Sequence, residues 1–117
     1  MEFMKISVDY HKMDYDVDFV NVERDDLLGD CYKHIGCDTI DIVDIDNTFV
    51  AIVDDEGLLK RGNHVFEFSN GYRLAGDILI ATNDMNEDME KELKTINIDS
   101  AFEFLCKYKI KLIGKTR

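Results

Sequence analysis

The sequence predicts a single small α+β domain over residues 1–117, in which a mainly antiparallel sheet carries two or three helices. Three observations predict this class. Several short runs rich in β-branched and aromatic residues alternate with polar residues at the period of a strand. Two segments place apolar residues at helical spacing. The 117 residues are 45% apolar and include no proline, which suits one modest core without a linker.

Two alternating runs at the start of the chain predict a β-hairpin. Residues 5–11 alternate apolar and polar side chains, and residues 14–21 repeat the pattern with aspartates at Asp14, Asp16 and Asp18. The short polar segment between the runs is suited to a turn.

Residues 24–35 predict a helix. Leu28, Cys31 and Ile35 belong to one apolar stripe at helical spacing. Acidic residues lie in the first turn and basic residues in the last, which matches the helix dipole. Gly36 then provides a residue that easily adopts the left-handed conformation at a helix end.

Residues 39–45 and 48–54 predict two paired strands at the centre of one antiparallel sheet. Both runs are rich in β-branched residues and are separated by a short polar break. Ile42 and Val43 are adjacent apolar residues, so we expect either that both faces are covered there or that a bulge intervenes. Residues 55–57 predict a turn.

The second half of the chain predicts shorter elements. Residues 64–68 suit a short strand or a helical turn, residues 70–71 are a turn, and residues 78–81 are a buried strand. Residues 85–93 alternate charges at helical spacing, which predicts a short exposed helix capped by Asn86.

A second helix is predicted over residues 100–108. Asp99 or Ser100 is its expected cap, and its apolar side chains are expected to face inward: Phe102, Leu105 and Cys106. Residues 107–112 alternate and suit either an edge strand or a continuation of this helix.

Negative charge is concentrated in the first half of the chain. The net charge is −11, and residues 1–56 carry 16 acidic and 4 basic residues. Such a field repels nucleic acid and membranes and attracts basic protein surfaces, although acidity also serves solubility. The N-terminus shows no secretory signal and no stretch approaches the roughly 20 apolar residues of a membrane span, so we expect a cytoplasmic protein.

Three side chains around the end of the first helix are candidate zinc ligands. Cys31, His34 and Cys37 lie within one helical turn and its exit, and Gly36 breaks the helix between them. Zinc prefers four ligands, so another histidine, cysteine or acid would have to complete the site. The alternative is a pair of buried thiols and a surface histidine. No cofactor other than this zinc is indicated.

Asp44-Ile45-Asp46-Asn47-Thr48 resembles the DxDxT signature of haloacid dehalogenase-type phosphatases. The resemblance implies Asp44 as nucleophile, Asp46 as general acid/base, and magnesium at the phosphate. That fold places the motif after a parallel strand that is followed by a helical crossover, whereas here another strand follows almost at once. We therefore expect the two aspartates at the tip of a hairpin and the protein not to be an enzyme.

A longer stretch resembles the family called domain of unknown function 3846. The resemblance rests on CYKHIGCDTIDIV (residues 31–43), VDDEGLL (residues 53–59) and LAGDILI (residues 74–80). Family members often have a cysteine at the position of Thr39 and a basic residue at that of Asp44, so this chain is more acidic there. The resemblance implies a small α+β domain in a phage or mobile-element setting and implies no catalytic residues.

These observations lead to a hypothesis of a non-enzymatic acidic binding protein that inhibits a host defence system. We expect an acidic face to occupy a basic surface of a host protein, such as the nucleic-acid channel of a CRISPR nuclease. Seven residues are candidates for that face: Asp38, Asp41, Asp44, Asp46, Asp54, Asp55 and Glu56.

Three other functions remain open, one of which is a small phosphatase that uses Asp44 and Asp46. Another alternative is a sponge for a small signalling nucleotide, for which Arg61, Tyr72 and Arg73 are candidate contacts. A further alternative is a protein that interacts with the host but does not inhibit a defence system.

Overall fold

The structure, a computed structural model, describes residues 1–85 and 91–117. These residues form an α+β domain with two antiparallel sheets, so the predicted class is confirmed and the prediction of a single sheet is wrong. The larger sheet has the order β2-β1-β7-β4-β3, and β8 pairs with the far end of β7. Its strands are β1 (Glu2–Asp9), β2 (Asp14–Asn21), β3 (Ile40–Asp44), β4 (Phe49–Asp54), β7 (Ile78–Met85) and β8 (Lys91–Lys94).

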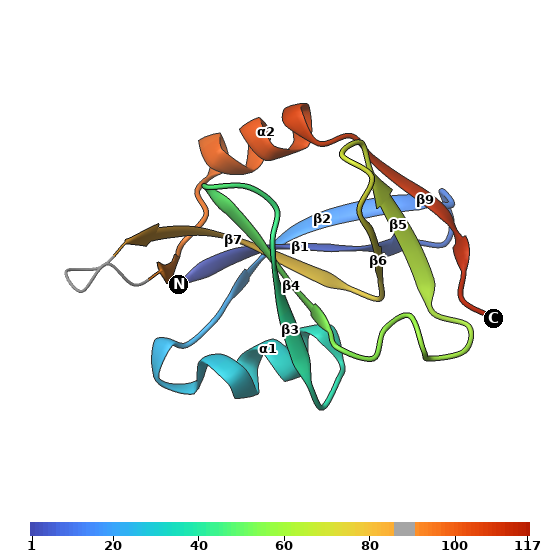
Figure 1. Ribbon diagram of the computed structural model, residues 1–117, viewed down its shortest axis with the longest axis horizontal. Coiled ribbons are helices and arrows are strands. Elements are labelled where there is room, and N and C mark those ends of the chain that lie inside the picture. Colours follow the sequence, from blue (N-terminus) through green and yellow to red (C-terminus); the bar gives the residue numbers. More distant parts are fainter. Residues whose placement is uncertain (86–90) are drawn as a thin grey trace.

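The smaller sheet and the helices cover the larger sheet. The smaller sheet consists of β6 (Arg73–Ala75), β5 (His64–Phe68) and β9 (Ile110–Lys115), in that order. Helix α1 (Leu27–Ile35) follows a 3₁₀ turn η1 (Arg24–Asp26), and α2 (Ile98–Lys107) precedes β9. Figure 1 shows α1 and α2 on opposite sides of the larger sheet. Among the described residues, no helix has the length and apolar character needed to cross a membrane.

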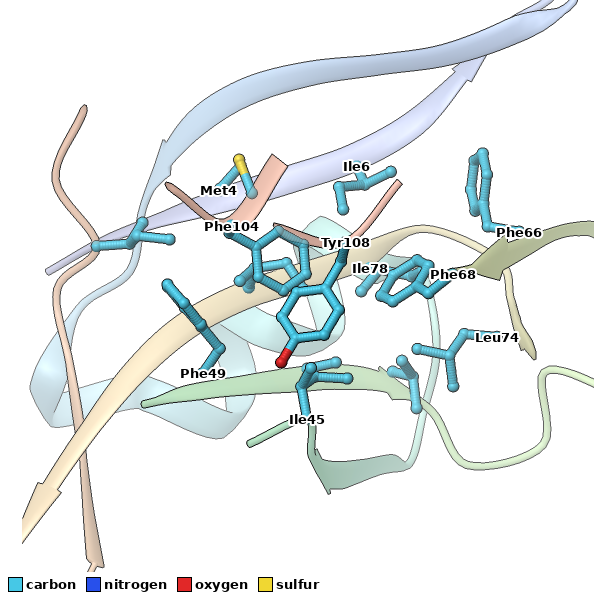
Figure 2. Packing of buried hydrophobic residues seen from close by; sticks show 14 of the residues in the cluster. Met4, Ile6, Ile45, Phe49, Phe66, Phe68, Leu74, Ile78, Phe104 and Tyr108 are labelled. Atoms are coloured by element: carbon cyan, nitrogen blue, oxygen red, sulfur yellow. The ribbon is translucent and has the colours of Figure 1, made fainter. Parts of the chain in front are cut away.

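The larger of two apolar clusters lies between the larger sheet, α2 and the smaller sheet. Phe104 of α2 lies at its centre, with ring centroids 5.1 Å from Phe49 and 5.9 Å from Phe68. Figure 2 shows how these rings meet Met4 and Ile6 of β1 and Leu74 of β6. Edge-to-face aromatic pairs of this kind contribute about 0.5–1.5 kcal/mol each beyond their burial.

The second cluster lies between the other face of the larger sheet and α1. Cys31 and Ile35 of α1 pack against Phe3, Ile52 and Leu79. The helix ends as predicted, because Gly36 adopts a left-handed conformation (φ 78°) and its N–H donates to the carbonyl of Tyr32. The larger sheet is therefore covered on both faces at its centre.

Strand β3 lies at an edge of the larger sheet, so its predicted central position is wrong. All six residues of β4 are buried, whereas within residues 1–85 and 91–117 β3 has a hydrogen-bonded strand neighbour on one side only. Neither expectation for Ile42 and Val43 holds, because β3 pairs with β4 residue for residue without a bulge and Ile42 is 48% exposed. The charges of Asp41 and Asp44 are compatible with an edge position because water reaches them there.

The prediction of a helix over residues 85–93 is wrong at both ends, because residue 85 belongs to β7 and residues 91–93 belong to another strand. Residues 91–94 form β8, which pairs with β7 from Thr82↔Lys94 to Met85↔Lys91. Residues 86–90, with the proposed cap Asn86, lie outside the described residues. The ambiguous residues 64–68 form strand β5.

Helix α2 begins earlier than predicted, and of the three side chains predicted to face inward only Leu105 does so. Its cap is Asn97, whose Oδ1 accepts the Ser100 amide at 2.8 Å, and not Asp99 or Ser100. Phe102 is 70% exposed and Cys106 is exposed as well. The inward stripe consists of Ala101, Phe104, Leu105 and Tyr108. After α2, β9 forms an edge strand of the smaller sheet, which was one of the two predicted alternatives.

Candidate functional site

The seven candidate carboxylates lie along β3 and at its two ends. Asp41 and Asp44 belong to the strand, and Asp46 lies in the turn that joins it to β4. Asp38 precedes β3, and the carbonyl next to it, that of Thr39, accepts the Asp55 amide at 3.2 Å. Asp54 is the last residue of β4 and lies opposite Ile40, and Asp55 and Glu56 follow it in a turn. The structure therefore spreads the seven residues along β3 and around its two ends and does not gather them at one point.

Asp46 is bound within the fold. Its Oδ1 accepts the amides of Thr48 (2.7 Å) and Phe49 (2.9 Å), and its Oδ2 accepts Lys107 Nζ (2.9 Å) and the Tyr108 hydroxyl. Figure 2 shows the Tyr108 hydroxyl at the margin of the aromatic cluster, on the side of Ile45. Burial alone raises the pKa of Asp46, but the hydrogen bonds from Tyr108, Lys107 and the two amides outweigh it and hold that pKa well below its usual range.

Asp54 is also compensated inside the protein. It is 8% exposed, forms an ion pair with Lys60, and accepts the Glu56 amide at 2.9 Å. The hydrogen bond to Asp54 raises the pKa of Lys60. Asp46 and Asp54 thus serve the fold, and five of the seven candidates remain exposed: Asp38, Asp41, Asp44, Asp55 and Glu56.

The hairpin of β1 and β2 carries a second group of carboxylates that the sequence analysis did not assign to a site. Asp14, Asp16 and Asp18 are exposed and occupy alternate positions of β2, so they share one face of the sheet. The register places Asp9 opposite Asp14, and Lys5 opposite Asp18. Among the described residues, no ion pair involves the three β2 aspartates. Lys5, which lies opposite Asp18, forms its ion pair with Asp77 instead. The signal for this group in the sequence was the strict alternation of aspartates with apolar residues over residues 14–19.

Asp44 and Asp46 do not have the context of a phosphatase motif. The strand that follows them, β4, is antiparallel to β3, as predicted for a hairpin tip. The Asp46 carboxylate already accepts four hydrogen bonds within the fold. The geometry therefore gives Asp46 a structural role at the turn, whereas Asp44 is an exposed residue at the end of β3.

The three candidate zinc ligands do not converge. Cys31 and Cys37 are buried, whereas His34 lies on the exposed side of α1 with Nε2 3.0 Å from the carbonyl of Asn21. Burial, then Asp30 and Cys37, raise the pKa of Cys31 to about 11, and burial also raises that of Cys37. Zinc binds thiolates, so protonated buried thiols do not suit it. Within residues 1–85 and 91–117, no three histidine, cysteine or acidic side chains are grouped so as to hold a metal ion.

The fold and this surface define a small α+β domain whose exposed sheet edges are acidic. Its family follows from comparison with known proteins. Residues 6–104 match the model of the family "Domain of unknown function (DUF3846)", and the chain belongs to this family. No curated protein and no solved structure matches the chain.

Proposed function

We propose that the protein is a non-enzymatic binding protein that presents acidic strands to a basic surface of a host protein. The phage or mobile-element setting implied for the family suggests a defence protein as the partner, such as a CRISPR nuclease, in the cytoplasm of the host cell. In that case the carboxylates take the place of nucleic-acid phosphates in a basic channel.

The row Asp14, Asp16 and Asp18 is the observation that carries this proposal. Alternate residues of a strand stand about 7 Å apart on one face, so the row is a regularly spaced polyanion. The hydrogen-bonded hairpin holds its backbone in place from Glu2↔Asn21 to Asp9↔Asp14. A charge array that is ordered before binding loses little conformational entropy when a partner arrives.

The exposed carboxylates of β3 extend the acidic surface to the opposite edge of the larger sheet. β2 and β3 are the two ends of the strand order, and both carry exposed aspartates on their strands. Lys5, Lys12, Arg24 and Lys33 are the only bases among residues 1–56. Both edges therefore carry several carboxylates, and beside β3 two bases from later in the chain accompany them, Lys60 paired with Asp54 and Arg73 in the groove of Asp41 and Asp55.

Capture of partners from a host lysate by three charge variants tests the proposal. One variant neutralises the β2 row (Asp14→Asn, Asp16→Asn, Asp18→Asn), and a second neutralises the exposed β3 edge (Asp41→Asn, Asp44→Asn, Asp55→Asn). Asp46 and Asp54 stay unchanged because they stabilise the fold. A control removes the same number of charges elsewhere: Asp25→Asn, Asp99→Asn and Glu103→Gln.

The proposal expects a captured basic protein that is lost in one or both edge variants but retained by the control. Capture should also weaken steeply as ionic strength rises, because the Debye length falls from about 30 Å at 0.01 M to about 8 Å at 0.15 M. Equal capture by all four proteins would refute the acidic surface as the binding site.

A groove on the smaller sheet supports a second candidate, a sponge for a signalling nucleotide. The groove has a volume of about 350 Å³ and is lined by Arg73, Lys115 and Arg117 beside apolar Val65 and Ile113. Cations next to apolar side chains suit a phosphate and a base.

The other two residues expected for the nucleotide site are elsewhere. Tyr72 donates to the carbonyl of Asp44 at 3.4 Å, and Arg61 does not line the groove. A thermal-shift screen with nucleotides tests this candidate; stabilisation that disappears in Arg73→Ala supports it, and no shift with any nucleotide refutes it.

A further inference from the structure

The outer side of β3 has no strand partner among the described residues. The Ile45 amide donates to Phe49 and the Thr39 carbonyl accepts from Asp55, so odd-numbered residues turn their backbone groups toward β4. Even-numbered residues of β3 therefore turn theirs away from the sheet. Of these, Asp44 already accepts a hydrogen bond from the Tyr72 hydroxyl at its carbonyl, so Ile40 and Ile42 are the positions considered for a partner. The Ile42 amide agrees with this, because it meets the Asp41 carboxylate at 2.9 Å and not β4.

Exposed apolar side chains and shallow grooves lie on both sides of this edge. Ile42 is 48% exposed beside a groove of about 260 Å³ that also includes Val50 and Leu93. On the other side, Leu58 and Leu59 are 59% and 84% exposed beside a groove of about 160 Å³. Clustered apolar groups of this size at a polar rim are typical of interaction surfaces.

The charges around β3 select a basic partner. Sheet edges are often protected by lysines, whereas the charged residues of β3 itself are all acidic. Asp41 and Asp55 line the groove beside Leu58, together with Asp54 and one base, Arg73. A second copy of this chain, with its net charge of −11, would bring further aspartates against Asp41. An extended segment with lysines or arginines meets these acids favourably.

From these observations we propose that β3 binds an extended basic segment of the partner, which adds to the larger sheet as a further strand. This inference rests on the proposed function and specifies its mode. Main-chain hydrogen bonds to Ile40 and Ile42 provide affinity, and alternate side chains of the segment enter the two grooves. Both grooves combine apolar and acidic side chains, so the segment carries apolar residues and bases on both of its faces. Its bases meet Asp44 and Glu92 on the side of Ile42, and Asp41 and Asp55 on the side of Leu58.

A synthetic peptide of ten alternating lysine and valine residues is the probe, and titration calorimetry at about 0.15 M salt measures its affinity. Ile42→Pro removes the outward amide but no charge and no bond to β4, and proline is tolerated at such an edge position. Ile42→Thr is the control, because it keeps the amide and shortens the side chain. The peptide N-methylated at every residue has the same charges but has no backbone N–H to donate on either edge, so it cannot pair with a strand.

We expect the unmodified peptide to bind the wild-type protein, and at least tenfold weaker binding for Ile42→Pro and for the N-methylated peptide. Binding to Ile42→Thr should stay within about threefold. Hydrogen exchange followed by NMR should show the Ile40 and Ile42 amides protected in the complex. If Ile42→Pro does not fold, the N-methylated peptide and the hydrogen-exchange data on the wild-type protein still test whether the peptide adds to β3 as a strand.

Three outcomes would overturn the inference: no binding of the peptide, equal binding of both peptides, or protection confined to β2. Equal binding that is lost in Asp41→Asn/Asp44→Asn/Asp55→Asn would leave an acidic binding surface without strand addition. A dimer of this chain that Ile42→Pro abolishes would make a second copy the occupant. The proposed function itself fails only if the charge variants leave partner capture unchanged.

Discussion

Asp46 lies in the acidic half of the chain, but its carboxylate stabilises the fold through hydrogen bonds and is not part of the exposed acidic surface. It fastens the β3–β4 turn to the end of α2, since it accepts from Thr48 and Phe49 in the turn and from Lys107 and Tyr108 at the helix end. The contacts to α2 span more than 60 residues of sequence, so no local pattern identifies them. Sequence analysis could place Asp46 at a hairpin tip but could not distinguish it from its exposed neighbours.

Replacement of Asp46 by asparagine should destabilise the protein in a pH-dependent way. Hydrogen bonds to a charged group contribute about 1.5–3 kcal/mol each, and we expect Asp46→Asn to cost about 2–3 kcal/mol at pH 7. Because the pKa of Asp46 is lower in the folded state, its contribution is complete above the unfolded pKa of about 3.9 and declines as the pH falls further.

Urea unfolding of both proteins at pH 7 and pH 3 measures this effect. The difference in free energy of unfolding should be smaller at pH 3 than at pH 7. A constant difference would show that the charge of Asp46 does not contribute. Glu103→Gln, on the exposed side of α2, is the control.

The three thiols should differ sharply in reactivity. Cys106 is exposed, whereas Cys31 and Cys37 are buried with raised pKa values. Because the thiolate is the reactive form, a thiol reagent at pH 8 should modify one cysteine quickly and the other two only after unfolding. Cys106→Ser should remove the fast phase. Rapid modification of more than one thiol in the native protein would contradict the burial of the pair.

At the scale of elements, the packing of the turn after β4 explains why the motif VDDEGLL has a glycine at position 57. A Cβ built on Gly57 would lie 2.7 Å from the carbonyl oxygen of Ala75, because the turn after β4 packs directly against β6. Asn63 donates to the Gly57 carbonyl at 3.1 Å and holds the turn from the other side. The glycine is therefore required by a close approach of two backbones.

Gly57→Ala should cost about 2–3 kcal/mol, in the range of overpacking in a core. Gly36→Ala is the comparison, since its Cβ meets nothing within 4 Å and the left-handed φ of 78° alone costs about 1–2 kcal/mol. Thermal or urea unfolding of both variants measures the two costs. A Gly57→Ala protein as stable as wild type would contradict the backbone contact.

The elements that sequence analysis identified best are those whose signals are local. The first hairpin, α1 with its glycine end, and β4 all carry periodic patterns or caps within a few residues. Residues 91–94 form a strand because they pair with β7, a contact that charges at helical spacing cannot reveal. In α2, Phe102 and Phe104 are both apolar, and only packing against Phe49 and Phe68 selects Phe104 for the core.

The periodic pattern of the sequence also could not reveal that β3 lies at an edge of the sheet. Strand order depends on contacts between distant segments, here β4 with β7. One local signal was available, because Asp41 and Asp44 place a charge on each face of β3, whereas residues 49–53 of β4 carry none. Charges on both faces of a short strand are compatible with an edge and not with a covered centre.

At the scale of the whole molecule, clustered negative charge should make stability depend on salt. Neighbouring carboxylates within the β2 row, and those along the β3 edge, repel one another at low ionic strength, and salt screens that repulsion. From about 0.01 M to 0.15 M NaCl, the free energy of unfolding of the wild type should rise by a few tenths of a kcal/mol to about 1 kcal/mol. The β2-row variant should show a smaller rise than the equally charged Asp25/Asp99/Glu103 control. Equal rises would mean that clustering has no energetic effect.

The salt concentration at which host proteins elute from the immobilised protein tests the central claim most directly. We expect a specific basic protein to elute from the wild type and from the Asp25/Asp99/Glu103 control at the same salt. From the β2-row or the β3-edge variant it should elute at much lower salt or not be retained. Elution at the same salt from all four proteins would contradict an acidic strand surface as the functional site.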